Sequence, residues 1–361
     1  MITGVVCEFN PFHDGHAHLI KEIKKNSDTR VVAFMSGNFV QRGDAAIFDK
    51  YSRAKTAVEN GADLVIEIPT VFAVQSAEGF AKASTDLMKK SNVIDSIAFG
   101  AECSDTEKLK DIAEFLKKEE TQKLISKEMK NGVSYAKAIQ NIAKTDILTT
   151  PNNVLAIEYL KNCNLPALAV KRIGKGHDSD DIFYSASAIR EELKKNNKDN
   201  LNFATLKNCE NAILYKLRTM SKSDFSLIPD VNEGLENKIV KAVAENTNIE
   251  NIIMAIKSKR YTHARIRRII LRAFLGISKD DIQSVPYLKI LAFNENGRKI
   301  LTKIKKQSSL PIITKHKDTK DLNGYAKYIY EKECMFTDIY SLMFNEPKNC
   351  SLEQKNSVLK L

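Results

Sequence analysis

Residues 2–20 read ITGVVCEFNPFHDGHAHLI, and this stretch contains the transition that decides the fold. Residues 2–7 are a continuous apolar run without the basic segment that precedes a secretory signal, so they predict a buried strand. A polar loop follows, and the amphipathic residues 16–25 predict a helix that begins near Gly15. A buried strand that passes through a loop into a helix is typical of the first unit of an α/β fold.

The same alternation of strands and helices continues to about residue 200. Because the apolar runs lack polar alternation, they predict a parallel sheet covered by helices on both faces. Ligands of such sheets bind beyond the carboxyl ends of the strands, where the strand order reverses. The further strands expected are residues 31–35, 63–68, 94–99 and 167–173, and the further helices are residues 51–60, 77–90 and 153–162.

From residue 200 onward the chain shows helical patterns and no strand pattern. We therefore expect a Rossmann-like parallel-sheet domain in residues 1–200 and a mainly α-helical domain in residues 201–361. The polar residues 346–361 predict a frayed tail or a short helix. The helices expected in the second domain are residues 206–220, 235–244, 249–257, 263–275, 294–306 and 325–344.

The positive charge of the chain is concentrated in one block. The 361 residues carry a formal net charge of +11. Residues 251–310 hold fourteen Lys or Arg and three Asp or Glu, so this block accounts for the whole surplus. A localised basic block indicates a polyanionic partner such as nucleic acid, and the alternative is a solvated helix face.

The cysteines and the apolar runs exclude several classes of protein. The six cysteines are scattered without a CxxC pair, so neither a zinc knuckle nor a disulfide framework is expected, and we predict no metal site. No apolar run reaches the roughly 18–20 residues that span a bilayer. We therefore expect a cytoplasmic protein without a membrane partner, and its oligomeric state stays open.

The polar loop after the first strand has the composition of a phosphate site. Backbone N–H groups at a helix start attract anions, and Gly15 allows a nucleotide to lie against bare backbone. His13 and His16 would donate hydrogen bonds to phosphate oxygens as charge builds during attack at an α-phosphate. Asn10 could hold a sugar or phosphate oxygen. The alternative is that the two histidines merely cap the helix.

This loop resembles the HxGH signature of the nucleotidyltransferase superfamily. Together with SGNFVQRG at 36–43 and PNNVLA at 151–156, residues 4–20 resemble the bacterial tRNA(Met) cytidine acetate ligases, and the resemblance covers essentially the whole chain. It implies a nucleotidyltransferase domain that binds ATP, with Mg²⁺ as the usual escort of ATP. It implies ATP contacts along Cys7, Glu8, Phe9, Asn10, Pro11, Phe12, His13, Asp14, Gly15, His16, Ala17, His18, Leu19 and Ile20.

The loop after the second strand is rich in glycine and polar side chains. It predicts a site for the acid substrate or the triphosphate, and the alternative is a solvated loop. Lys50, Arg53 and Lys55 begin the next helix and could be ordinary surface charge. The candidate residues of the loop are Gly37, Asn38, Gln41 and Arg42.

Three further segments follow strands or begin helices near the expected crevice. Gly100 ends the fourth strand, where a side chain would block the nucleotide, and the alternative is a simple turn glycine. Asn152 and Asn153 stand at a helix start, so one of them is expected to be structural, and the resemblance implies that the other contacts ATP. Arg172 and Ile173 end the fifth strand, and the resemblance implies that they contact ATP.

Residues 185–190, SASAIR, resemble the second phosphate signature of the superfamily. Ser185 and Ser187 would hold the β- and γ-phosphates, and Arg190 would stabilise the departing pyrophosphate. A capped amphipathic helix is the alternative. The run Met220-Ser221-Lys222-Ser223 imitates part of the KMSKS loop of class I synthetases, but its place after a long helix favours a helix-capping turn.

The most basic part of the second half surrounds one aromatic residue. Its cations can neutralise phosphates, and Tyr261 could stack on a splayed base. The candidate tRNA contacts are Lys257, Lys259, Arg260, Tyr261, Arg265, Arg267 and Arg268.

The resemblance implies an ATP-dependent ligase with His13, His16 and Arg190 as its catalytic residues. In that family the acid is acetate, and the acceptor is the exocyclic amine of the wobble cytidine of elongator tRNA-Met. The rival readings are a small-molecule adenylyltransferase and an RNA-binding factor with a vestigial nucleotide site. The first explains the histidine motif but not the basic block, and the intact motif argues against the second.

Overall fold

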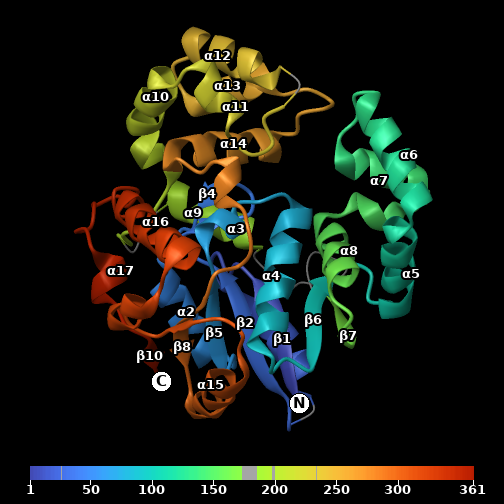
Figure 1. The fold of residues 1–361 in the computed structure, drawn as a ribbon, viewed down its shortest axis with the longest axis vertical. Coiled ribbons are helices and arrows are strands. Elements are labelled where there is room, and N and C mark those ends of the chain that lie inside the picture. The colour runs from blue at the N-terminus through green and yellow to red at the C-terminus, as the bar shows by residue number, and fades with distance from the viewer. Residues whose placement is uncertain (26, 173–184, 197–199, 233) are drawn as a thin grey trace.

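The computed structural model describes residues 1–25, 27–172, 185–196, 200–232 and 234–361. Its centre is an eight-stranded sheet, in which β5, β2, β1, β6 and β7 follow one another and pair in parallel (Figure 1). The five strands predicted in the first half are thus confirmed. The strands of the sheet are β1 (Ile2–Cys7), β2 (Arg30–Ser36), β5 (Leu64–Ile68), β6 (Ser96–Ala101), β7 (Ala167–Lys171), β8 (Leu288–Phe293), β9 (Ile312–Ile313) and β10 (Leu359–Lys360).

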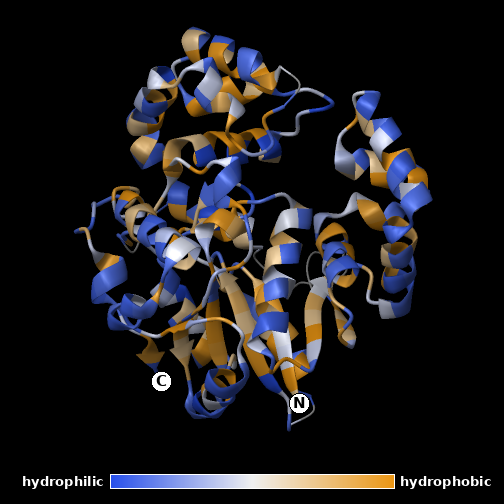
Figure 2. Cartoon of the chain, viewed as in Figure 1, coloured by the Kyte–Doolittle hydropathy of each residue, from blue (hydrophilic) through white to orange (hydrophobic). Residues whose placement is uncertain are grey.

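Helices cover both faces of the sheet, as the apolar strands require. Val5, Ala33 and Val65 belong to the apolar cluster that packs against α1 and α2. Val32 and Ile97 point to the opposite face and belong to the cluster of α4 and α8. Figure 2 shows the resulting apolar strands between helices of mixed polarity. The covering helices are α1 (Asp14–Ile23), α2 (Lys50–Glu59), α4 (Ala77–Ser91) and α8 (Pro151–Asn162).

The expectation that strands are absent after residue 200 is wrong. β8 pairs antiparallel with β5, and β9 and β10 pair with β8. The chain therefore returns to the sheet of the first half, and the division at residue 200 stays a prediction about folding units. Of the two alternatives for residues 346–361, the short helix is confirmed as α17 (Leu352–Lys355), in which Glu353 is buried, whereas the strand β10 was not expected.

Two helical lobes stand above the carboxyl edge of the sheet (Figure 1). One lobe is an insertion between β6 and α8, and the other contains most of the helices expected in the second half. No helix among the described residues is long and apolar enough to cross a bilayer. The first lobe contains α5 (Thr106–Lys117), α6 (Glu119–Lys130) and α7 (Tyr135–Ala143), and the second contains α10 (Glu210–Thr219), α11 (Lys222–Ser226), α12 (Leu235–Glu245), α13 (Ile249–Ile256) and α14 (His263–Leu275).

The remaining elements connect these parts. The expected helix at 206–220 is divided into a 3₁₀ turn and α10. The loop after β2 contains a small hairpin that its composition did not predict. These elements are β3 (Phe39–Val40), β4 (Asp44–Ala45), α3 (Thr70–Ala73), η1 (Asp146–Thr149), α9 (Ala186–Lys195), η2 (Leu206–Cys209), η3 (Lys279–Asp281), α15 (Glu295–Gln307), η4 (His316–Asp321) and α16 (Gly324–Ser341).

Candidate functional site

The two histidines of the motif form the cap of α1. His13 is the N-cap residue, and its Nδ1 accepts a hydrogen bond from the backbone N–H of Gly15 (3.0 Å). His16 Nδ1 accepts from the backbone N–H of His13 (3.3 Å). The capping alternative is therefore real, but it uses one nitrogen of each ring. Because both Nδ1 atoms accept, the proton of each neutral ring is on Nε2, which remains as the donor atom.

The surroundings of this cap keep both rings neutral. Burial, followed by the positive charge of Arg172, lowers the pKa of His13. Burial, followed by His13 and Arg172, lowers the pKa of His16 to about 3. The rings of Phe9 and Phe12 pack against His16, with centroid distances of 4.9 and 5.6 Å. The cap is thus a fixed pair of neutral N–H donors at a helix start.

A cavity of about 190 Å³ opens beside this cap, at the carboxyl ends of β1 and β6. The strand order reverses between these two strands, so the cavity lies where parallel sheets bind ligands. Of the candidate run 7–20, seven residues line it and the other seven do not. The lining residues are Val6, Cys7, Glu8, Phe9, Gly15, His16, His18, Leu19, Gln41, Arg42, Phe80, Phe99, Gly100, Asn152, Leu155, Tyr159, Val170, Lys171 and Arg172.

The two neighbouring asparagines have different surroundings. Asn153 is buried, its Oδ1 accepts from the backbone N–H of Cys103 (3.0 Å), and its Nδ2 donates to the carbonyl of Ile147 (2.9 Å). Asn152 lines the cavity and donates to Glu102 Oε1 (2.6 Å). Neither is the N-cap of α8, because that residue is Thr150. Asn153 therefore holds the loop after β6 in place, and Asn152 is the one of the pair that lines the cavity.

Gly100 and Arg172 meet on the same side of the cavity. A Cβ on Gly100 would lie 3.4 Å from Cγ of Arg172, so the glycine leaves the space beside this side chain open. The Arg172 side chain is 40% exposed, and its Nε lies 3.7 Å from Glu102 Oε1. Arg172 thus places a partly exposed positive charge on the wall of the cavity. Ile173 lies outside the described residues.

The loop after β2 presents two of its four candidate residues to the cavity. Gln41 and Arg42 line it. The backbone N–H of Gln41 donates to Glu8 Oε1 (2.8 Å), and its Nε2 donates to the carbonyl of Gln75 (3.1 Å). Burial raises the pKa of Glu8, against the opposing effect of the Gln41 N–H and of nearby arginines. Glu8 thus ties this loop to the end of β1.

Gly37 and Asn38 lie behind the loop. Asn38 is buried, its Nδ2 donates to Thr337 Oγ1 (3.2 Å), and its Oδ1 accepts from the backbone N–H of Lys50 (3.1 Å). The space next to Gly37 is filled by the carboxylate of Glu67. These two candidates support the shape of the loop and do not face the cavity.

The surface-charge reading is wrong for Lys50 and Arg53, which are buried, and it holds for Lys55. The Arg53 guanidinium donates to the carbonyls of Glu8 (2.5 Å), Ser36 (3.2 Å) and Gly37. It therefore joins the carboxyl ends of β1 and β2 beneath the loop. The helix pattern of residues 51–60 could not reveal this, because the carbonyls come from distant segments.

Arg190 reaches the first loop from α9. Its Nη1 donates to the carbonyl of Asn10 (2.5 Å), and its Nη2 donates to Ser187 Oγ (3.1 Å). Ser185 is the N-cap of α9, so the capped-helix alternative is also present. The side chain of Asn10 is buried and accepts from the backbone N–H of Ile47 (2.7 Å), which is a structural contact. Arg190 and the two serines do not line the cavity described above.

A buried cluster of charges was missed by the sequence analysis. Lys50 Nζ lies 2.6 Å from Glu67 Oε1 and 2.8 Å from Glu353 Oε2. Lys289 on β8 contacts Glu353 and lies 3.5 Å from Glu67 Oε2. Burial and the neighbouring Lys50 lower the pKa of Lys289 to about 7. Its position behind Gly37 makes this cluster a support of the loop after β2.

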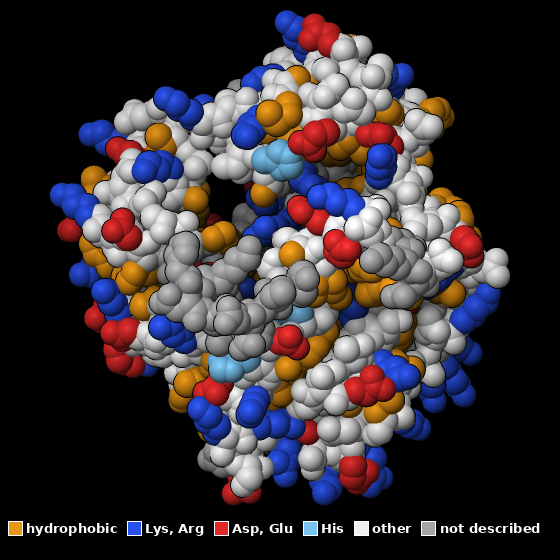
Figure 3. All heavy atoms as spheres, turned by 180° about the vertical axis from the view of Figure 1, so that it is seen from behind, with side chains coloured by type: hydrophobic (Ala, Val, Ile, Leu, Met, Phe, Trp, Pro, Cys, Tyr) orange, Lys and Arg blue, Asp and Glu red, His pale blue; other side chains and the backbone are white. Residues whose placement is uncertain are grey.

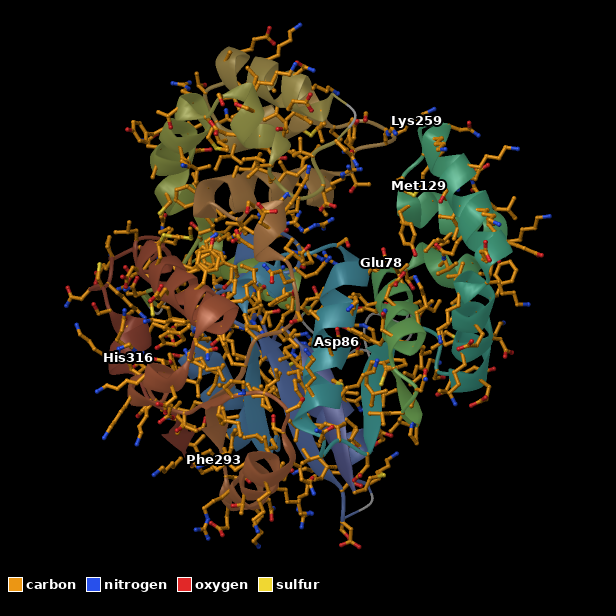
Figure 4. All side chains as sticks on the ribbon, viewed as in Figure 1. Glu78, Asp86, Met129, Lys259, Phe293 and His316 are labelled. Atoms are coloured by element: carbon orange, nitrogen blue, oxygen red, sulfur yellow. The ribbon has the colours of Figure 1, made fainter. Side chains whose placement is uncertain are left out.

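The candidate tRNA contacts divide into an exposed and an inward-facing group. Lys257 and Lys259 are exposed in the loop between α13 and α14, and Lys259 projects from its tip in Figure 4. The Arg265 guanidinium lies 5.1 Å from the centre of the Tyr261 ring and donates to the carbonyl of Asp230 (2.6 Å). Arg260 also lies near that ring, at 5.9 Å. Tyr261 is half-buried between cations.

The start of α14 is docked on the loop after β2. Arg267 pairs with Asp44 (2.7 Å), whereas Arg268 is 8% exposed. Gly43 has a φ of +74°, and a Cβ there would lie 2.6 Å from the backbone N of Arg268. The glycine therefore permits the loop to pack against the helix backbone. From the back, Figure 3 shows a hollow between the two helical lobes, with Lys and Arg side chains at its floor.

Arg272 of α14, which the sequence analysis did not select, is buried against segments that lie far away in the sequence. Its side chain is fully buried and pairs with Asp230 (2.7 Å). It also donates to the carbonyl of Val74 (2.8 Å) and to Gln75 Oε1 (3.1 Å). Because Gln75 accepts from Gln41, this arginine connects the helical lobe with the wall of the cavity.

The imitation of the KMSKS loop is a helix cap. Ser221 is the N-cap of α11, and it exchanges hydrogen bonds with Asp224 in a capping box. The favoured interpretation of this run is thus confirmed. In the described ranges, no group of three or more His, Cys, Asp or Glu side chains could hold a metal ion.

Comparison with known proteins supplies relatives over the full length. The family described as HIGH Nucleotidyl Transferase matches residues 1–355. A tRNA(Met) cytidine acetate ligase from Thermoanaerobacter sp. (strain X514) is 36% identical, with all of both chains covered. The protein of the same name from Caldanaerobacter subterraneus subsp. tengcongensis is 37% identical over 99% of each chain.

Solved structures give the same result for the fold. Thermotoga maritima TmcAL bound with alpha-thio ATP has a TM-score of 0.90 and 26% sequence identity, and the match covers 100% of this chain and 99% of the other. The apo form of that protein matches with the same TM-score. The overall fold is therefore shared with a relative whose structure was solved with an ATP analogue bound.

Proposed function

The chain belongs to the HIGH nucleotidyl transferase family and, within it, to the tRNA(Met) cytidine acetate ligases, and from this membership we propose that it activates acetate with ATP and acetylates a cytidine of tRNA(Met). The observation that carries the proposal is the histidine cap beside the cavity. It places two neutral N–H donors and a helix start where parallel sheets bind nucleotides. ATP lies there in the proposal, as the Thermotoga relative binds alpha-thio ATP.

The first step forms acetyl-adenylate. A carboxylate oxygen of acetate attacks the α-phosphorus of ATP, the bond to the bridging oxygen breaks, and pyrophosphate leaves with the electron pair. His13 and His16 donate from Nε2 to the phosphate oxygens, whose charge grows during attack. Their lowered pKa values keep both histidines in the neutral form from which Nε2 donates. Arg190, beside the first loop, stabilises the pyrophosphate.

The cavity offers separate groups for the nucleotide and the acid. Gly100, Asn152 and Arg172 contact the adenosine part in this proposal, and Gln41 and Arg42 hold the carboxylate of acetate. Arg42 supplies the positive charge that an anionic substrate requires. Mg²⁺ accompanies the phosphates of ATP, and no step here depends on it.

The second step transfers the acetyl group to RNA. The exocyclic amine nitrogen of cytidine attacks the carbonyl carbon of the adenylate, AMP leaves, and the amine loses a proton. We propose the wobble cytidine of elongator tRNA-Met as the acceptor. The exposed Lys257 and Lys259 and the partly exposed Arg260 bind its phosphates. Tyr261 offers a surface for a splayed base.

The test is pyrophosphate exchange into ATP with acetate and without RNA. We expect exchange that depends on acetate, and acetylcytidine in tRNA(Met) when the RNA is added and its nucleosides are analysed by mass spectrometry. Transfer of AMP to a phosphorylated small molecule without acetate-dependent exchange would favour the adenylyltransferase reading. Normal acetylation by His16→Ala would remove the catalytic assignment and favour an RNA-binding factor.

A further inference from the structure

The cavity extends across the edge of the sheet and has chemically different ends. Phe9, Leu19 and Val170 line it from the cluster on the α1 face. Phe80, Phe99 and Tyr159 line it from the cluster on the α4 and α8 face. The end on the α1 face adjoins the histidine cap and therefore the phosphates. The end on the other face has aromatic walls.

The aromatic end is tied to the loop that holds Gln41. The Gln41 side chain donates to the carbonyl of Gln75 (3.1 Å), and the next residue, Ser76, is the N-cap of α4. Phe80 lies in the first turn of that helix, where its backbone N–H donates to the carbonyl of Ser76 (2.9 Å). One short turn thus fixes both Gln41 and Phe80 relative to the cavity.

The side chains that form these walls are buried. The exposed fractions of Phe80, Phe99 and Tyr159 are 2%, 3% and 5%, although all three line the cavity. The rings of Phe99 and Tyr159 lie 6.0 Å apart between centroids. Buried rings that already fill their surroundings cannot move aside for an additional methylene group without strain.

We propose that this aromatic end receives the alkyl group of the acid and that Phe80 sets its maximum length. The inference rests on the proposed function, since it leaves the carboxylate beside the α-phosphate and assigns only the alkyl group of the acid to the end opposite the phosphates. A carboxylate held by Gln41 and Arg42 directs its alkyl group toward the aromatic walls. Acetate fits with its single methyl group, and the Phe80 ring excludes longer chains.

The experiment compares acids in pyrophosphate exchange without RNA. The quantity measured is kcat/KM for propionate divided by kcat/KM for acetate, in the wild type, Phe80→Ala and Phe80→Leu. A hydrophobic pocket discriminates by about 10- to 200-fold per methylene group, so we expect the ratio to rise at least about tenfold in Phe80→Ala and less in Phe80→Leu. The KM for ATP should change far less than this ratio.

Leu87→Ala is the matched control. Leu87 lies on the same helix and is fully buried in the same cluster, but it does not line the cavity. It should lower stability without changing the acid ratio. An unchanged ratio in folded Phe80→Leu, or an equal change in Leu87→Ala, would overturn the inference. Absence of acetate-dependent exchange in the wild type would instead overturn the proposed function itself.

Discussion

The histidine cap at residues 13–16 and the first turns of α14 are both dense in groups that can bind phosphate, yet they use them differently. In the cap, the backbone of the same turn satisfies one nitrogen of each ring and directs the other outward. In α14, carbonyls and carboxylates from distant segments bind Arg265, Arg267 and Arg272. Motif spacing thus fixes local geometry, whereas a count of charges does not tell which of them face solvent.

Removing the inward-facing Arg272 should give the largest effect. Arg272→Ala leaves the carbonyl of Val74 and the carboxylate of Asp230 without their partner, so we expect a loss of about 3–5 kcal/mol in the free energy of unfolding. Urea denaturation measures it. Lys259→Ala, an exposed cation of the same basic block, should stay within about 0.5 kcal/mol of the wild type. Similar losses in both variants would erase the contrast between the two groups of cations.

The cap should control chemistry and not RNA binding. Because one preorganised donor to a growing charge is worth about 10²–10³ in rate, His16→Ala should slow pyrophosphate exchange by that factor. Affinity for tRNA should be unaffected in a filter-binding assay. His263→Ala, which removes a half-exposed histidine paired with Glu250, serves as the control for exchange. Equally slow pyrophosphate exchange in both variants would show that the loss is not specific to the histidine cap.

The exposed group should control RNA binding and not adenylation. For Lys259→Ala/Arg260→Ala we expect about tenfold weaker tRNA binding at low salt, and a shallower slope of log affinity against log salt, because fewer counterions are released. Exchange without RNA should change less than twofold. Equal losses of binding and exchange would mean that the two regions form one site.

The pH dependence of stability gives the smallest contrast. The unfolded chain binds a proton at His16 with an ordinary pKa near 6.5, whereas the folded chain does so only at about 3. The folded state therefore loses stability as the pH falls through 6.5, by about 1 kcal/mol between pH 7 and pH 5.5. Urea denaturation at both pH values should show this loss of stability in the wild type and not in His16→Gln. The same pH response in both proteins would show that His16 protonates normally in the folded state.

The parallel core could be predicted because its strands are mainly apolar runs that alternate with helical patterns. β8 could not, because it stands among helical patterns, and the carboxylates of Glu67 and Glu353 that pair with its Lys289 lie far away in the sequence. Prediction of the site from the sequence was limited in the same way. The histidines follow from their spacing, but the different surroundings of Asn152 and Asn153 depend on the loop after β6.

The carboxylate of Glu353 also links the site to the order in which the chain is made. Lys50 and Lys289 share this counter-charge, and the loop that carries Gln41 rests on their cluster through Asn38 and Gly37. On the ribosome, the first strands emerge long before residue 353 is synthesised. A nascent chain therefore has its histidine motif early but lacks the charges that support the loop after β2. This support is complete only when α17 is in place and β10 has joined the edge of the sheet.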